Sequence, residues 1–306
     1  MDSEHDESIE DTQHEIAELE AKLAAARQRL QKKAKTETTL VHRPSEIPLT
    51  VPDAFSSANH YILLLSDSAL PLGSFAFSSG LESYLAHTPR NSATFSVFLP
   101  ESISSYASTT LPFVLAAYRD PSALATLDDT LDAAIICTVG RRASIAQGRA
   151  LLSIWERSFA SSLPHHAVEA LKPYAALLRA SNSASSASSS AKTPAGACHD
   201  LPPAAHAHLA PLFGAVASLV GLTLHQTAYV FMLSHIKALV SAAVRASMFG
   251  PYQAQKVLGS GDVPRMIAAA IEREWATPVE EAGQTMPIMD LWIGRHELLY
   301  SRIFNS

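Results

Sequence analysis

The sequence has 306 residues, a formal net charge of −6 and 7% aromatic residues, and its length is enough to bury a sizeable core. This charge excludes a protein that holds nucleic acid through a broadly basic surface. Runs of β-branched residues are few, which favours an all-α fold. Cys137 and Cys198 are too few for a disulfide framework, and the acidic N-terminus has no apolar leader, so we expect a cytoplasmic protein.

Residues 1–58 form a charged extension. Its first twenty residues hold nine acidic groups and no Lys or Arg, whereas residues 21–35 hold six basic groups and no acidic ones. Apolar residues alternate three and four positions apart at Ile16, Leu19, Leu23, Ala26 and Leu30. This seam spans about two heptads, fewer than a sustained coiled coil needs, so we predict a solvated helix, with a coiled coil as the alternative.

A flexible linker is predicted from residue 36 to residue 58, because Pro44, Pro48 and Pro52 interrupt any regular pattern. We therefore expect residues 59–306 to form a single domain.

The stretch from Ser66 to Tyr84 has the most distinctive pattern of the chain. Pro71 and Gly73 predict a turn, and Gly80 opens an amphipathic helix. Leu81 follows Gly80 where a phosphate-binding loop requires Lys, and no serine here has the flanking glycines of a nucleophile elbow. Two glycines are also too few for a dinucleotide-binding loop. None of these three catalytic or nucleotide-binding motifs is therefore present in this stretch.

Two further helices are predicted before a low-complexity stretch. One runs from Phe95 to Tyr118, with a kink or restart at Pro112, and the next begins near Asp128 and continues through Leu152. Residues 181–190 contain seven serines, so a disordered loop is predicted at about 181–197.

Two alternatives to a non-catalytic helical protein remain open. Cysteine and histidine ligands suit zinc, nickel or copper, so the chain could bind a metal through Cys198, His199, His206 and His208, although their spacing matches no established finger. The second alternative is a helical membrane protein, because residues 201–236 carry no formal charge. Polar residues and prolines interrupt that stretch, so a buried core helix is the better interpretation, with His225 and His235 as core histidines.

The last twelve residues, 295–306, are rich in Arg, Tyr and Phe, a composition typical of an interface anchor. His296 stands beside Glu297, but no second histidine follows at the spacing that a metal-binding helix needs.

Four segments, in this order, resemble the UreF family of urease accessory proteins. They are Ala-Leu-Pro-Leu-Gly-Ser-Phe with Ser-x-Gly-Leu-Glu after it, Arg-x-Ser-x-x-x-Gly-Arg-Ala-Leu-Leu from residue 142, Val-Arg with Gly and Gln-x-x-Leu from residue 244, and a final Arg-x-Phe-x-Ser. Met248-Phe249 and Pro251-Tyr252 depart from the family pattern. The resemblance covers residues 59–306 apart from the serine-rich stretch.

The resemblance implies an all-α helical bundle of roughly eight to ten helices without catalytic activity. It implies a homodimer that joins the accessory protein UreD (also called UreH) and the GTPase UreG and delivers nickel to apo-urease. Nickel and GTP would be handled by those partners, with no cofactor bound here, and neither nucleic acid nor a membrane would be involved. The expected partner-binding residues are Phe75, Ser78, Gly80, Glu82, Tyr84, Arg245, Gly250, Gln253, Arg295, His296, Glu297, Tyr300, Arg302 and Phe304.

Overall fold

A computed structural model of the chain describes residues 18, 20–28, 58–89, 91–188 and 205–305. The chain divides into two units, Met1–Asp53 and Ala54–Ser306. In the first unit residues 20–28 are helical and exposed, and Lys22 Nζ lies 2.7 Å from Glu18 Oε1 in an i, i+4 ion pair. The linker predicted for residues 36–58 lies outside the described residues, except for Ala58.

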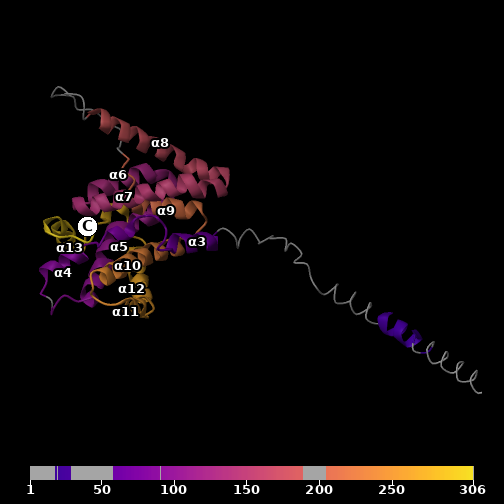
Figure 1. Cartoon of the computed structure of the whole chain (residues 1–306). Coiled ribbons are helices and arrows are strands. Elements are labelled where there is room, and N and C mark those ends of the chain that lie inside the picture. Colours follow the sequence, from indigo (N-terminus) through magenta and orange to yellow (C-terminus); the bar gives the residue numbers. More distant parts are fainter. Residues whose placement is uncertain (1–17, 19, 29–57, 90, 189–204, 306) are drawn as a thin grey trace, which may run out of the picture. The chain divides into compact units, whose positions relative to one another are not determined.

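The second unit is helical, and no strand occurs among its described residues (Figure 1). The predicted all-α fold is confirmed, and the described residues of this unit form eleven α-helices rather than eight to ten. These are α3 (Ala58–Ser66), α4 (Leu81–His87), α5 (Phe95–Arg119), α6 (Leu124–Ala134), α7 (Thr138–Ile154), α8 (His165–Ser188), α9 (Leu209–Leu219), α10 (Leu224–Arg245), α11 (Pro251–Leu258), α12 (Asp262–Glu274) and α13 (Pro287–Arg295). Short 3₁₀ turns include η1 (Ser74–Ala76) and η6 (His296–Leu298).

Helix α5 is the centre of the core. It packs against α9, α10 and α12, and Figure 1 shows it between α7 and α9 on one side and α10 and α12 on the other. Leu111, Phe113 and Val114 are fully buried. The restart predicted at Pro112 as the alternative to a kink is wrong, because α5 continues through Pro100 and Pro112 as one helix. The stabilisation that α5 gains from packing against three helices outweighs the cost of a proline inside a helix.

The helix predicted from Asp128 through Leu152 is instead two helices, α6 and α7. Ile135 is the extended residue that ends α6, and Cys137 is the extended residue that precedes α7. The Arg141 guanidinium donates from Nη2 to the Asp132 and Ile135 carbonyls, at 2.8 and 3.1 Å. Arg141 therefore caps the C-terminus of α6.

The serine-rich stretch begins as helix, since α8 continues to Ser188. The loop predicted from about residue 181 is therefore wrong for residues 181–188, where alanine and serine tolerate a helical backbone. The remainder of the predicted loop, residues 189–197, lies outside the described part of the chain.

Two glycines allow the backbone segments of the core to approach closely. A Cβ atom on Gly148 in α7 would lie 1.9 Å from the Ala207 carbonyl oxygen, and one on Gly214 in α9 would lie 2.1 Å from the Val114 oxygen. Gly148 thus allows the segment that precedes α9 to pack closely against α7, and Gly214 allows α9 to pack closely against α5. No residue with a Cβ fits either position without movement of the backbone.

A buried carboxylate holds the segment that precedes α9. Asp128 is fully buried and accepts hydrogen bonds from the backbone N–H groups of His206, Ala207 and His208 at 2.7, 3.1 and 2.6 Å. Ala207 adopts a left-handed conformation with φ of 65°. Three charge-assisted hydrogen bonds stabilise a backbone shape that an alanine rarely takes.

Helix α10 is the one helix among the described residues that is long and apolar enough to cross a membrane, but 61% of its most apolar 18-residue window is buried inside the fold. It is therefore explained as a core helix. His235 is a core histidine as predicted, because its ring stacks on Tyr106 and its Nε2 lies 3.0 Å from Ser102 Oγ. The same prediction for His225 is wrong, since that side chain is exposed and stacks on Trp275.

Gly148→Ala should lower the free energy of unfolding by about 3 kcal/mol or more, because the new methyl group overlaps the Ala207 carbonyl. Urea denaturation followed by circular dichroism measures this change. Gly283→Ala is the matched control, since no atom lies within 4 Å of its Cβ position, and it should cost less than about 0.5 kcal/mol. Equal stability of the two variants would contradict the close packing of α7.

Burial lowers the pKa of His235 to about 3. At a pH below the ordinary histidine pKa of about 6.5, His235 is protonated in the unfolded chain but stays neutral in the folded chain. Because the unfolded chain binds this additional proton, the free energy of unfolding falls as the pH drops from about 6.5 toward 3. In His235→Gln the loss of stability between pH 7 and pH 5 should be smaller than in the parent protein by about 2 kcal/mol. An unchanged pH dependence in His235→Gln would refute the assignment.

Candidate partner-binding surface

The turn predicted in the stretch from Ser66 to Tyr84 is present. Gly73 has a φ of 74° and Gly80 a φ of 88°, in the left-handed region that glycine adopts at little cost. A Cβ on Gly80 would lie 3.0 Å from Trp292 Cβ and 3.1 Å from the Ile293 nitrogen. Gly80 therefore both starts α4 and admits α13 beside it.

Glu82 joins this stretch to the end of the chain. Its carboxylate accepts hydrogen bonds from the backbone N–H groups of Ile303 and Phe304 at 2.6 and 3.2 Å, and from His296 Nε2 at 2.8 Å. Since a carboxylate can only accept, His296 Nε2 carries the proton. The His296 side chain is fully buried and that of Glu82 is 11% exposed, so water competes little for these bonds.

Further contacts hold the tail, which we define as residues 296–305. The Asn305 N–H donates to the Ala76 carbonyl at 2.8 Å. The Arg245 guanidinium lies over the ring of Phe304, 4.3 Å from its centre, and donates from Nη2 to the Phe75 carbonyl. Partial burial lowers the pKa of Arg245. The end of α10 thus clamps the tail onto η1.

Aromatic side chains pack against the buried face of helix α4. Tyr84 is buried, with ring centres 5.1 Å from Phe98 and 5.7 Å from Trp292. Its hydroxyl accepts a hydrogen bond from the Thr94 N–H at 3.2 Å. Ser78 is also fully buried, and its Oγ lies 3.4 Å from the Glu82 nitrogen. These residues fix the position of Glu82.

Around this rigid support, four large apolar side chains are exposed to solvent. We call them the tail patch: Phe75, Leu298, Tyr300 and Ile303, which are 64, 75, 106 and 63% exposed. Leu298 and Ile303 were missed from the sequence, although apolar residues within a short polar tail could have indicated them. An apolar group held in water on a fixed backbone can bind a partner with little loss of conformational entropy.

The predicted partner-binding residues therefore fall into two groups. Five are buried inside the unit: Ser78, Gly80, Tyr84, His296 and Phe304. Glu82 is half-buried, and the others are exposed: Phe75, Arg245, Gly250, Gln253, Arg295, Glu297, Tyr300 and Arg302. Glu297 pairs with Arg142 of α7, whereas Gly250 and Gln253 lie at the start of α11. The buried residues hold the backbone of this surface in place, and the exposed residues are the ones that a partner could contact.

The histidines predicted as an alternative metal site have other partners. The His208 ring is buried, with Nε2 donating to Asp132 Oδ1 at 3.0 Å and Nδ1 3.1 Å from Ser144 Oγ. Burial lowers the pKa of His208, and the hydrogen bond to Asp132 opposes this shift. His206 Nε2 lies 3.6 Å from Asp132 Oδ2. No group of three potential ligands occurs among the described residues, and Cys198 and His199 lie outside them.

Glu82→Gln should release the tail, because an amide presents N–H groups toward the backbone donors of Ile303 and Phe304. Hydrogen exchange of these two amides should accelerate at least about tenfold, which corresponds to ~1.4 kcal/mol. Glu297→Gln removes only an exposed ion pair and should leave the exchange unchanged. Protection of both amides in Glu82→Gln would show that the tail is held by other contacts.

Comparison with known proteins gives consistent matches. The sequence profile of the UreF family matches residues 90–260. A UreF-like urease accessory protein of Schizosaccharomyces pombe is 34% identical over 249 residues, which cover 81% of this chain and 97% of that protein. Urease accessory protein F of Oryza sativa subsp. japonica is 30% identical over 78% of this chain and 82% of its own. Urease accessory protein UreF of Paenarthrobacter aurescens is 28% identical over 82% of this chain and 100% of its own.

These matches cover 78 to 82% of this chain in proteins from a fungus, a plant and a bacterium, and they agree with the four sequence segments and the all-α fold. Proteins of this kind serve urease as accessory proteins and not as catalysts. The chain belongs to the UreF family of urease accessory proteins.

Proposed function

We propose that this protein is a non-catalytic scaffold that joins a UreD-type (UreH-type) protein and the GTPase UreG, and that the assembly delivers nickel to apo-urease. In this proposal nickel is cargo, and nickel and GTP are handled by the partners. The protein acts in the cytoplasm and forms a homodimer. Membership of the UreF family supports the urease accessory role.

The observation that carries the proposal is the tail patch on its rigid support. Four exposed apolar side chains surround a backbone fixed by Glu82 and Arg245. Apolar side chains at the centre of an interface with charged residues at its rim are typical of protein–protein recognition, and the exposed Arg295 and Arg302 lie close to the patch in sequence. We propose that the UreD-type partner covers this patch.

Deletion of the last twelve residues would be an ambiguous test, because His296 and Phe304 belong to the interior. Substitution of exposed residues separates binding from folding. The double variant Leu298→Asp, Tyr300→Asp places two carboxylates on the patch at side chains that are 75 and 106% exposed.

After co-expression with the UreD-type and UreG-type proteins of the same organism, the parent chain should co-elute with them on size exclusion. The double variant should elute apart from the UreD-type protein, because burying two carboxylates in an apolar interface costs several kcal/mol. Tyr252→Asp is the control, since this tyrosine is 91% exposed on α11, outside the patch.

Co-elution of the double variant with the UreD-type protein would reject the tail patch as its binding surface. Absence of any complex with the parent chain would reject the scaffold itself. Circular dichroism of each variant confirms that the comparison is made between folded proteins.

A further inference from the structure

A cavity with a volume of about 370 Å³ lies inside the helical unit, between α5, α7, α10 and α13. Its volume falls within the range of about 300 to 1,000 Å³ that is typical of small-molecule sites. Leu131, Met289 and Ile293 form part of its apolar lining, and none of the four tail-patch residues lines it. The cavity reaches the surface beside Ile136, a lining residue that is 84% exposed.

The face of α5 that borders this cavity is polar, although α5 is the centre of the core. Ser102, Ser105, Tyr106 and Thr109 recur three and four positions apart, so they share one face of the helix, and all four line the cavity. The Thr109 hydroxyl donates to the Ser105 carbonyl at 2.7 Å, and the Thr110 hydroxyl donates to the Tyr106 carbonyl. Because these hydrogens are used within the helix, the two hydroxyl oxygens remain as acceptors.

Tyr106 is held rigidly in this wall. Its ring stacks on Phe231 and on His235 of α10, with ring centres 5.1 and 3.9 Å away. Burial raises the pKa of Tyr106, so its hydroxyl stays protonated at neutral pH. Among the described residues this hydroxyl has no hydrogen-bond partner. Since buried polar groups normally have partners, the hydroxyl is available to a molecule in the cavity.

The charge of the lining has one sign. Of the described residues that line the cavity, Asp290 of α13 alone carries a formal charge, and His235 is neutral because burial lowers its pKa to about 3. Gln284 Nε2 donates to Asp290 Oδ1 at 3.0 Å, but within the described part of the chain no Lys or Arg pairs with this carboxylate. An anion would be repelled here, whereas a cation would supply the missing countercharge.

The donor set of the cavity favours an organic cation over a metal ion. Asp290 and the thiol of Cys137 both line the cavity, but no group of three potential metal ligands occurs among the described residues. The carboxylate and the hydroxyl oxygens of α5 instead suit a molecule that brings several N–H donors of its own.

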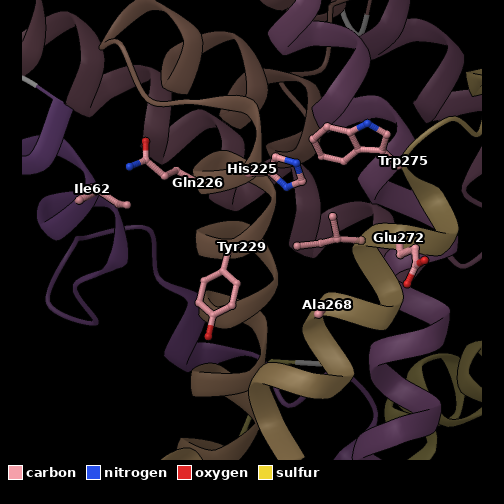
Figure 2. A pocket seen from close by; sticks show the side chains of 8 residues that line it. Ile62, His225, Gln226, Tyr229, Ala268, Glu272 and Trp275 are labelled. Carbon is pink, nitrogen blue, oxygen red and sulfur yellow. The ribbon is translucent and has the colours of Figure 1, made fainter.

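The larger groove between α3, α10 and α12, with a volume of about 630 Å³, has a different character. Figure 2 shows His225 beside Trp275 at one end of it, and Tyr229 along α10. It also has a carboxylate, that of Glu272, but this side chain is exposed and water screens its charge. Glu272 therefore offers a matched control for Asp290.

We propose that the cavity between α5, α7, α10 and α13 binds a small organic monocation with several N–H donors, of the protonated alkylamine or alkylguanidine class. The cationic group pairs with Asp290, its other N–H groups donate to the hydroxyl oxygens of α5, and the alkyl chain packs against Met289 and Ile293. This site is separate from the partner surface proposed above, and it adds a ligand to a protein that otherwise acts through protein contacts.

Nuclear magnetic resonance of the full chain with ¹³C-methyl methionine tests the proposal, with n-butylguanidinium as the probe. Met289 is 1% exposed and lines the cavity, so its methyl resonance should shift saturably at probe concentrations up to about 10 mM. The methyl group of Met266, on α12 and outside the cavity, should not shift. The neutral isostere n-butylurea should bind at least about tenfold more weakly, because it lacks the charge.

Asp290→Asn keeps the size of the side chain and should weaken n-butylguanidinium binding at least about tenfold, with no change for n-butylurea. Thr109→Val removes one acceptor with little change of shape and should weaken the same binding about threefold. Glu272→Gln should leave both affinities unchanged.

Absence of a saturable Met289 shift in the parent chain would overturn the proposal, as would equal affinities for n-butylguanidinium and n-butylurea. Unchanged binding in both Asp290→Asn and Thr109→Val would place the probe elsewhere and overturn it as well.

Discussion

The candidate surface depends on the Glu82 carboxylate, which binds two backbone N–H groups and a buried histidine from the end of the chain. Without a carboxylate at this point, the tail would lack a partner for its inward-facing donors. Asp128 does the same for the segment before α9, where it binds three consecutive N–H groups. In both cases a partly or fully buried acid takes the place of the helical hydrogen bonds that an irregular segment lacks.

Much of the helical architecture could be predicted, because apolar periodicity reports which face of a helix is buried. The turn at Gly73 and the helix start at Gly80 were likewise predicted from residue type, and the structure adds that both glycines are left-handed. The pairing of Glu82 with His296 could not be predicted, since the two residues are 214 positions apart and no local pattern links them. For the same reason Phe304 was predicted at a partner surface, whereas it packs inside the unit.

The remaining differences arise where tertiary packing outweighs local preference. Pro112 has no effect on the continuity of α5, because three helices enclose it. His225 has the same type of neighbours in sequence as His235, but only His235 faces α5; the former lies at the surface against Trp275. Composition alone does not distinguish the two faces of a mostly apolar helix such as α10.

The order in which the chain is synthesised gives the Glu82 contacts a further meaning. Glu82 is made early, and the groups that it binds follow 214 to 222 residues later. The surface that carries the tail patch is completed only when residues 296–304 have left the ribosome, so a chain interrupted earlier would present no finished surface to a partner.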